Sequence, residues 1–138
     1  MVNRDVLRSR IELINNHLNR ILPYKGLSYE DFLKDMEAQD IVEYNFFQIV
    51  NHLISLTEHI VVDEDYGLPQ TPYEAAMILR DKGVLDKGDL VLLRKMIGFR
   101  NVIGHDYVHL NKEIVYSLLK SGQKDVGQIL TRITGKFF

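Results

Sequence analysis

The chain of 138 residues has no cysteine, only three prolines and no apolar run as long as a membrane span. Without cysteine there is no disulfide, no thiolate nucleophile and no cysteine-ligated zinc, and this composition fits a reducing compartment. The first five residues, MVNRD, contain no apolar signal core. We therefore expect a cytoplasmic protein without a membrane segment.

An excess of charge of one sign is also missing, since 17 Lys and Arg face 19 Asp and Glu, for a net charge of −2. This balance excludes a generic polyanion binder, so any contact with nucleic acid must come from a local patch. Hydrophobic residues make up 46% and charged residues 26%, which is typical of a globular soluble protein. The length predicts a single domain over residues 1–138.

Helical periodicity covers nearly all of the sequence outside short breaks. A first helix is expected over about 4–22, with apolar residues spaced four and three apart, and Pro23 ends it. A second helix begins near Ser28, where an acid follows three residues after a capping hydroxyl, and continues to about residue 62.

Three further helical segments follow. Thr71, Pro72 and Glu74 open a short helix that stops at Gly83. A fourth helix starts over 86–89, and a fifth runs from Asn111 to Ser121–Gly122 before a final turn or two up to residue 133. No strand alternation or hairpin signal is present, so the sequence predicts an all-α, up-down bundle of about five helices.

The second helix carries apolar residues on more than one face. They are Ile41, Val42, Phe46, Phe47, Ile49, Val50, Leu53, Ile54, Leu56, Ile60 and Val61. A helix that is apolar on two faces needs two partners, and one of them could be a second copy of the chain. The alternative is a central helix that is buried within one bundle.

The segment that ends the fourth helix combines Arg100, His105 and Tyr107. Arginine matches phosphate oxygens, and histidine exchanges protons near neutral pH, so the pair could cleave a phosphodiester without a metal. His105 would lie about 140° away from Arg100 on an ideal helix, but an end at Gly104 could swing it back. The alternative is a glycine-terminated helix with a basic last turn. Asp40 could be a solvated acid or a buried partner of Arg100.

The other histidines give a weaker signal. His52 and His59 are seven residues apart, and His105 and His109 are four apart. Two histidines at helical spacing could hold a metal, but a site also needs a third ligand. Structural roles are favoured, and we expect no metal site.

The Arg-x4-His-x-Tyr pattern resembles the signature of HEPN-domain proteins, and specifically of the HepT-like toxin branch. The likeness extends to residues 68–76, 79, 82–85, 96–101 and 111–116, and to a short third helix that precedes the helix with the motif. It covers most of the chain and is firmest from Leu68 to Leu119. Gly104 stands where a larger residue is common, and Tyr116 takes the place of an aromatic that is often Trp.

This resemblance implies a HEPN-like bundle that acts as a metal-independent endoribonuclease, with no cofactor, in a two-gene toxin–antitoxin pair. The antitoxin of the branch is a minimal nucleotidyltransferase, which can adenylylate the motif tyrosine, here Tyr107. The family is typically a homodimer in which the motifs of two protomers face one cleft.

On this reading His105 is the general acid or base, and Arg100 binds the scissile phosphate of the RNA. Tyr107 would orient phosphate or RNA, Asn101 would brace the helix end, and Asp106 would hold Tyr107 or stay solvated. Two other classes of protein remain open. One is a non-catalytic module that docks on a nucleotidyltransferase, and the other is a purely structural helical dimer.

Overall fold

The computed structural model describes residues 1–105 and 111–138, except for the burial of Gly104 and the side chain of His105. The described residues form helices and no strand, which confirms the all-α prediction. The elements are α1 (Arg4–Ile21), the 3-10 turn η1 (Leu22–Tyr24), α2 (Tyr29–Lys34), α3 (Met36–Asp63), α4 (Pro72–Asp81), α5 (Lys87–His105) and α6 (Lys112–Phe137).

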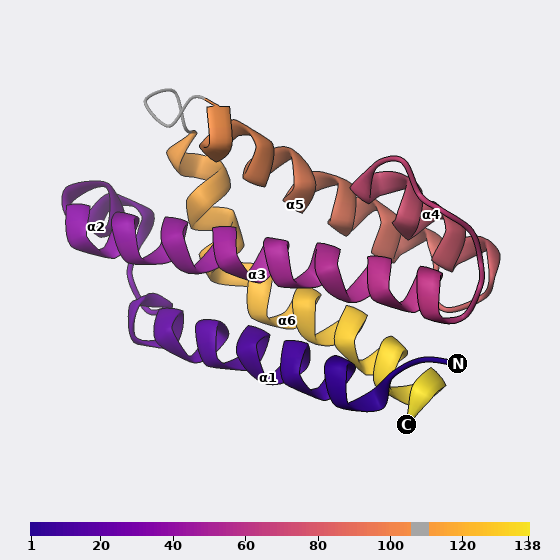
Figure 1. The fold of residues 1–138 in the computed structure, drawn as a ribbon. Helices are drawn as coiled ribbons and strands as arrows, with labels where there is room; N and C mark the ends of the chain where they lie inside the picture. The colour runs from indigo at the N-terminus through magenta and orange to yellow at the C-terminus, as the bar shows by residue number, and fades with distance from the viewer. Residues whose placement is uncertain (106–110) are drawn as a thin grey trace.

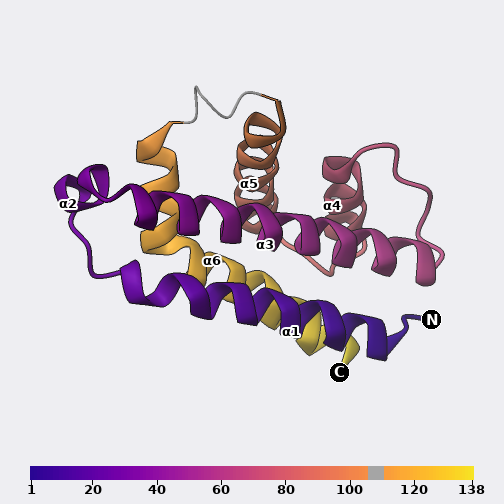
Figure 2. The same cartoon turned by 60° about the vertical axis from the view of Figure 1, so that its left-hand side comes forward.

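Helix α3 is the centre of the bundle and contacts each of the other α-helices. Helix α1 runs beside it on one side, α4 and α5 lie on the other, and α6 crosses beneath (Figure 1). The end of α5 and the beginning of α6 lie at one end of the bundle, and the N- and C-termini lie at the opposite end (Figure 2). The motif helix therefore ends far from both termini.

The width of the apolar surface on α3 is explained by this central position. Its buried hydrophobic residues are Ala38, Val42, Phe46, Ile49, Val50, Leu53, Ile54, Leu56, Ile60 and Val61. They belong to one core cluster that extends from Val2 to Ile133. The alternative of a helix buried within one bundle thus accounts for the pattern, and dimerisation and the single domain stay predictions.

The prediction of one helix from Ser28 to about residue 62 was wrong at Asp35. There the backbone leaves the helical region, with φ −110° and ψ 90°, and the carboxylate caps α3 by accepting the Ala38 N–H at 2.9 Å. The buried Gln39 amide donates to the carbonyls of Phe32 and Leu33 at 2.9 and 3.1 Å, which satisfies acceptors that the end of α2 leaves open. Aspartate at a helix N-cap explains the break.

The prediction that a fifth helix ends at Ser121–Gly122 was also wrong, because α6 continues through both residues to Phe137. Gly122 is buried, and a Cβ at this position would overlap the ring of Phe46 on α3. The glycine therefore allows two helices to approach closely, and it does not mark a helix end. No helix in the described ranges has the length and apolar character needed to cross a membrane.

Candidate active site

The start of the motif helix α5 is fixed by two reciprocal hydrogen bonds. The Asp89 N–H donates to Asp86 Oδ1 at 2.9 Å, and the Asp86 N–H donates to Asp89 Oδ2 at 3.0 Å. This is the geometry of a capping box, in which two backbone donors at a helix start are satisfied by side chains. The capping hydrogen bonds lower the pKa of Asp86, chiefly the one from the Asp89 backbone.

A cation from α6 completes this capping arrangement. Arg132 Nε lies 2.6 Å from Asp89 Oδ2, and Arg132 Nη2 lies 2.6 Å from Asp86 Oδ2. Asp89 has no exposed surface, and its burial raises the pKa of its carboxyl group. The arginine thereby fixes α5 against α6, a contact between residues 43 positions apart that no sequence pattern indicated.

The start of α6 is fixed in a similar way against α3. Asn111 Oδ1 accepts the N–H groups of Glu113 and Ile114 at 2.8 and 3.4 Å, as the prediction of a cap at this residue requires. The next residue, Lys112, places Nζ 2.5 Å from Oε1 of Glu43, whose side chain is only 1% exposed. A buried carboxylate of α3 therefore holds the first turn of α6 in place.

Arg100 lies in the last turns of α5 and is half-buried. Its Nη2 donates to Oδ1 of the neighbouring, exposed Asn101 at 2.9 Å. Its Nε is buried and has no hydrogen-bond partner in the part of the chain that the structure describes. A buried donor without a partner is uncommon in folded proteins, and a bound ligand is one way to satisfy it. The guanidinium is thus held through Nη2, while no residue that the structure describes accepts from its Nε.

The remaining motif residues can be placed only in part. The backbone of His105 ends α5, while its side chain lies outside the described residues, as do Asp106, Tyr107 and His109. The convergence of Arg100 and His105 on one phosphate therefore stays a prediction. Asp40 is exposed on α3, which excludes a buried acid at that position.

His52 belongs to a cluster between α1 and α3 that the sequence did not reveal. Its ring stacks on that of His17 with centroids 5.7 Å apart, and its Nδ1 accepts from Arg10 Nη1 at 3.2 Å. His17 Nδ1 donates to Asn45 Oδ1 at 2.8 Å. Burial lowers the pKa of His52, and the charges of Arg10 and His17 lower it further. Within the described ranges, no three metal-binding side chains gather at one place.

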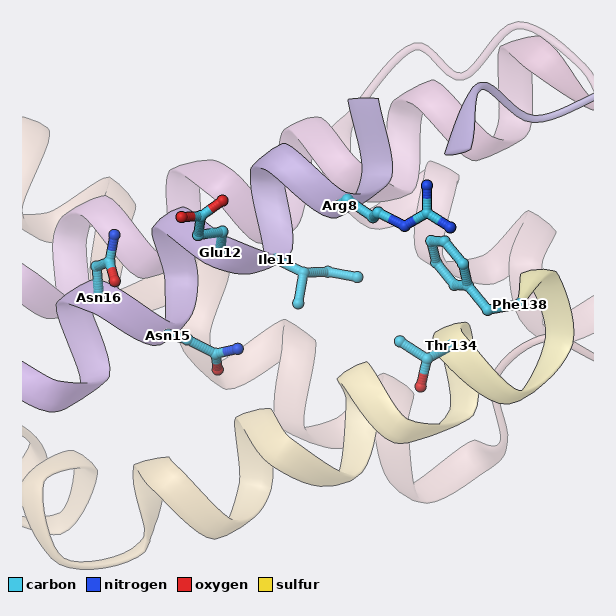
Figure 3. Close-up of a pocket in the computed structure, with 7 residues that line it drawn as sticks. All are labelled: Arg8, Ile11, Glu12, Asn15, Asn16, Thr134 and Phe138. Carbon is cyan, nitrogen blue, oxygen red and sulfur yellow. The ribbon is translucent and has the colours of Figure 1, made fainter. Parts of the chain in front are cut away.

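One cavity of about 400 Å³ lies between α1 and the end of α6. Figure 3 shows Ile11 pointing into it and the Arg8 guanidinium over the Phe138 ring, 5.0 Å from the ring centroid. Glu12 also lines this cavity, so its charges are of both signs. It lies at the end of the bundle with the chain termini, away from the last turn of α5 (Figure 1).

Proteins of known structure and function share this fold and are 25–27% identical in sequence. A tri-AMPylated HEPN toxin from Shewanella oneidensis, solved in complex with an MNT antitoxin, superposes with a TM-score of 0.86 at 27% identity over 95% of this chain and 98% of that chain. The mRNA nuclease HepT of the same organism is 27% identical over 126 residues, which are 91% of this chain and 94% of the relative. The tRNA nuclease HepT of Aphanizomenon flos-aquae is 25% identical over 111 residues, 80% and 76% of the two chains.

The fold and these relatives define the class as all-α HEPN ribonucleases. The family model described as "Ribonuclease HepT-like" matches residues 14–133. The chain belongs to this HepT-like family. The predicted family and the predicted ribonuclease class are thereby confirmed, whereas the roles of Arg100, Asn101, His105 and Tyr107 stay predictions.

Proposed function

We propose that the chain is a metal-independent endoribonuclease toxin that cleaves RNA with Arg100 and His105 and is paired with a minimal nucleotidyltransferase antitoxin. The observation that carries this proposal is the state of Arg100, which Asn101 anchors through Nη2 while the buried Nε has no partner among the described residues. Such a guanidinium offers fixed donors to a phosphate at little further cost in ordering. Membership of the ribonuclease family supplies the reaction class.

The proposed reaction is an internal transfer at phosphorus. His105 takes the proton of the ribose 2′-hydroxyl, and the 2′-oxygen forms a new bond to phosphorus as the bond to the 5′-oxygen breaks. The departing oxygen receives a proton, so the products are a 2′,3′-cyclic phosphate and a 5′-hydroxyl. Arg100 stabilises the charge that grows on the phosphate oxygens, a contribution of about 10²–10³ in rate for one fixed donor.

Tyr107 is the proposed point of control. The related toxin from Shewanella oneidensis is AMPylated and bound to an MNT antitoxin, which supports the same chemistry on this chain. An AMP group on the phenol would add bulk and negative charge next to the residues that bind phosphate. RNA would then be excluded both sterically and by charge repulsion.

A homodimer is part of the proposal, and the surface of α3 supports it. Tyr44 and Val62 are 57% and 54% exposed, and their separation of 18 residues is five helical turns, so they share one face. Met36, near the start of the same helix, is 74% exposed. Tyr44 also contacts His17 of α1 edge-on, with ring centroids 6.3 Å apart, and the exposed parts of these side chains are available to a second copy.

The test is RNA cleavage by the purified chain in the presence of a chelator. Wild type should cut a single-stranded RNA, and Arg100→Ala and His105→Ala should lose cleavage while circular dichroism shows unchanged helical content. Lys124→Ala, which removes an exposed cation from α6, is the control and should cut like wild type. A non-catalytic docking module or a purely structural helical dimer would leave RNA intact in every case, and cleavage that is independent of Arg100 and His105 would remove both residues from the mechanism.

Control by the antitoxin is tested separately. Co-expression with the proposed nucleotidyltransferase antitoxin should add the mass of one or more AMP groups to the peptide that contains Tyr107. Tyr107→Phe should remain unmodified and should stay toxic in the presence of the antitoxin. An unmodified peptide from wild-type cells would contradict this part of the proposal.

A further inference from the structure

A second cavity, of about 340 Å³, lies between the last turns of α5 and the first turn of α6. Its walls are mainly apolar: Phe99 is buried, while Val102 and Ile114 are 42% and 38% exposed. Large apolar side chains that stay exposed around a cavity are typical of a binding site.

One wall of this cavity is a glycine with open space above it. A Cβ built on Gly98 would meet no atom within 4 Å, so the helix surface there is flat and uncovered. The neighbouring Phe99 and Val102 contribute the apolar surface beside it. A planar ring could therefore lie against α5 at this point without displacing any side chain.

The polar side chains that line the cavity are hydrogen-bond donors, and two of them are positively charged. Asn111 uses its Oδ1 to cap α6, and its Nδ2 makes no hydrogen bond to any residue that the structure describes. Arg94 and Lys95 also line the cavity and are exposed. Arg94 lies over the Tyr73 ring at 5.4 Å from its centroid, and Lys95 Nζ lies 3.2 Å from Ser117 Oγ. Among the residues that the structure describes, no acidic side chain lines the cavity.

We propose that this cavity between α5 and α6 binds one base of the single-stranded RNA that flanks the bond to be cut. The apolar wall takes the face of the base, the Asn111 amide donates to a carbonyl oxygen or ring nitrogen, and Arg94 and Lys95 attract the flanking phosphates. Proteins that bind single-stranded RNA combine an apolar surface for the base with basic side chains for the phosphates, and the cavity has both features.

The cavity lies on the side of α5 away from Arg100. Gly98 and Val102 are each two residues from Arg100, so they lie about 160° from it around the helix. A strand whose phosphate contacts Arg100 reaches the cavity by passing around half of α5, so the base bound there belongs to a flanking nucleotide. This inference rests on the proposed function, because it assigns the base specificity of the same reaction to Phe99, Val102 and Asn111.

The test fills the cavity and measures RNA binding, which is independent of cleavage. In the His105→Ala background, Gly98→Leu should weaken binding of a fluorescent single-stranded oligonucleotide about tenfold, the loss expected for one base contact. Binding of a ribose-phosphate strand without bases should be the same with and without Gly98→Leu. Gly127→Leu is the matched control, because Gly127 on α6 also has open space around its Cβ position and lies outside the cavity.

A second variant tests the inference if Gly98→Leu fails to fold. Val102→Glu places a negative charge at the mouth of the cavity and should weaken oligonucleotide binding at least as much as Gly98→Leu. Unchanged binding in both variants, or equal weakening in Gly127→Leu or with the base-free strand, overturns the inference. Weakened binding of free AMP with unchanged RNA binding also overturns it, since the cavity would then serve a free nucleotide.

Failure of the proposed function gives a different result. If wild type binds RNA, Gly98→Leu weakens this binding, and wild type does not cleave RNA, the base-binding site is supported and the proposed ribonuclease mechanism is contradicted. If Gly98→Leu cleaves RNA with the same KM and the same base preference as wild type, the proposed mechanism is supported and the base-binding site is contradicted. In a cleaving protein with a base site, Gly98→Leu raises KM about tenfold and flattens the preference for the flanking base.

Discussion

Arg132 on α6 forms a 2.6 Å contact through Nε with Oδ2 of Asp89, a carboxylate without exposed surface in the first turn of α5. A second contact of 2.6 Å joins the same guanidinium to Asp86. Two consecutive long helices are thereby joined, so the position of the start of α5 depends on a residue near the end of α6.

Removal of Arg132 should be costly. Arg132→Met leaves the Asp89 carboxylate buried without its cation, and we expect the free energy of unfolding to fall by about 3 kcal/mol. Urea denaturation measures this, with Lys136→Met, one turn along the exposed surface of α6, as the control that changes stability little. Equal stability of Arg132→Met and wild type would show that the ion pair makes no net contribution.

The close approach at Gly122 predicts an unusual effect of alanine. Alanine normally stabilises a helix relative to glycine by about 1 kcal/mol, but here its Cβ would overlap the Phe46 ring. Gly122→Ala should therefore destabilise the fold by about 1–3 kcal/mol, the range for an overpacked core. Gly127→Ala, where nothing lies within 4 Å, should be stabilising in the same denaturation experiment. A stabilised Gly122→Ala variant would contradict the packing of α6 on α3.

The cluster around His52 predicts how stability depends on pH. Burial, Arg10 and His17 lower the pKa of His52 from its ordinary value of 6.5, so the unfolded chain takes up a proton more readily than the folded one. The contribution of His52 is therefore complete above pH 6.5 and is lost progressively as the pH falls below it.

The measurement is the urea midpoint between about pH 5 and pH 7.5, where histidine titrates. His52→Asn keeps an acceptor for Arg10 but cannot be protonated in this range, so its stability should fall less steeply toward acid than that of wild type. The same slope in both proteins would assign the acid sensitivity to other groups.

The hydrogen bond between Asn101 and Arg100 predicts an effect on cleavage. Asn101→Ala removes the acceptor that holds Nη2, and we expect kcat/KM for RNA to fall about tenfold, because a hydrogen bond to a charged group contributes on the order of 1.5 kcal/mol. Helical content should be unchanged, since Asn101 is exposed. Full activity of Asn101→Ala would show that Arg100 needs no support from this side chain.

The sequence predicted the all-α class and most helix ends because these depend on local chemistry. Ser28, Thr71 and Asn111 cap helices as their neighbours in sequence indicate, and Gly83 follows α4 with φ +76°. The family was predicted from the Arg-x4-His-x-Tyr pattern and its surroundings, and the match over residues 14–133 confirms it.

The errors arose where a distant part of the chain decides local structure, as at Gly122, or where local side-chain hydrogen bonds interrupt a helical pattern, as at Asp35. Gly122 resembles a helix terminator until Phe46 is placed against it, and Asp35 interrupts a helical pattern because Gln39 can satisfy the carbonyls of α2. Arg132, Glu43 and His17 gave no signal because their partners are far away in sequence. The support of Arg100 by Asn101, by contrast, joins adjacent residues.

The measurement that tests the central claim most directly is the chemistry of the RNA ends after cleavage in the presence of a chelator. Wild type should leave a 2′,3′-cyclic phosphate and a 5′-hydroxyl, detected by mass spectrometry, and Arg100→Ala and His105→Ala should each lower the yield by at least about 10². Products with a 5′-phosphate, or cyclic ends formed equally well without Arg100 or His105, would contradict the account.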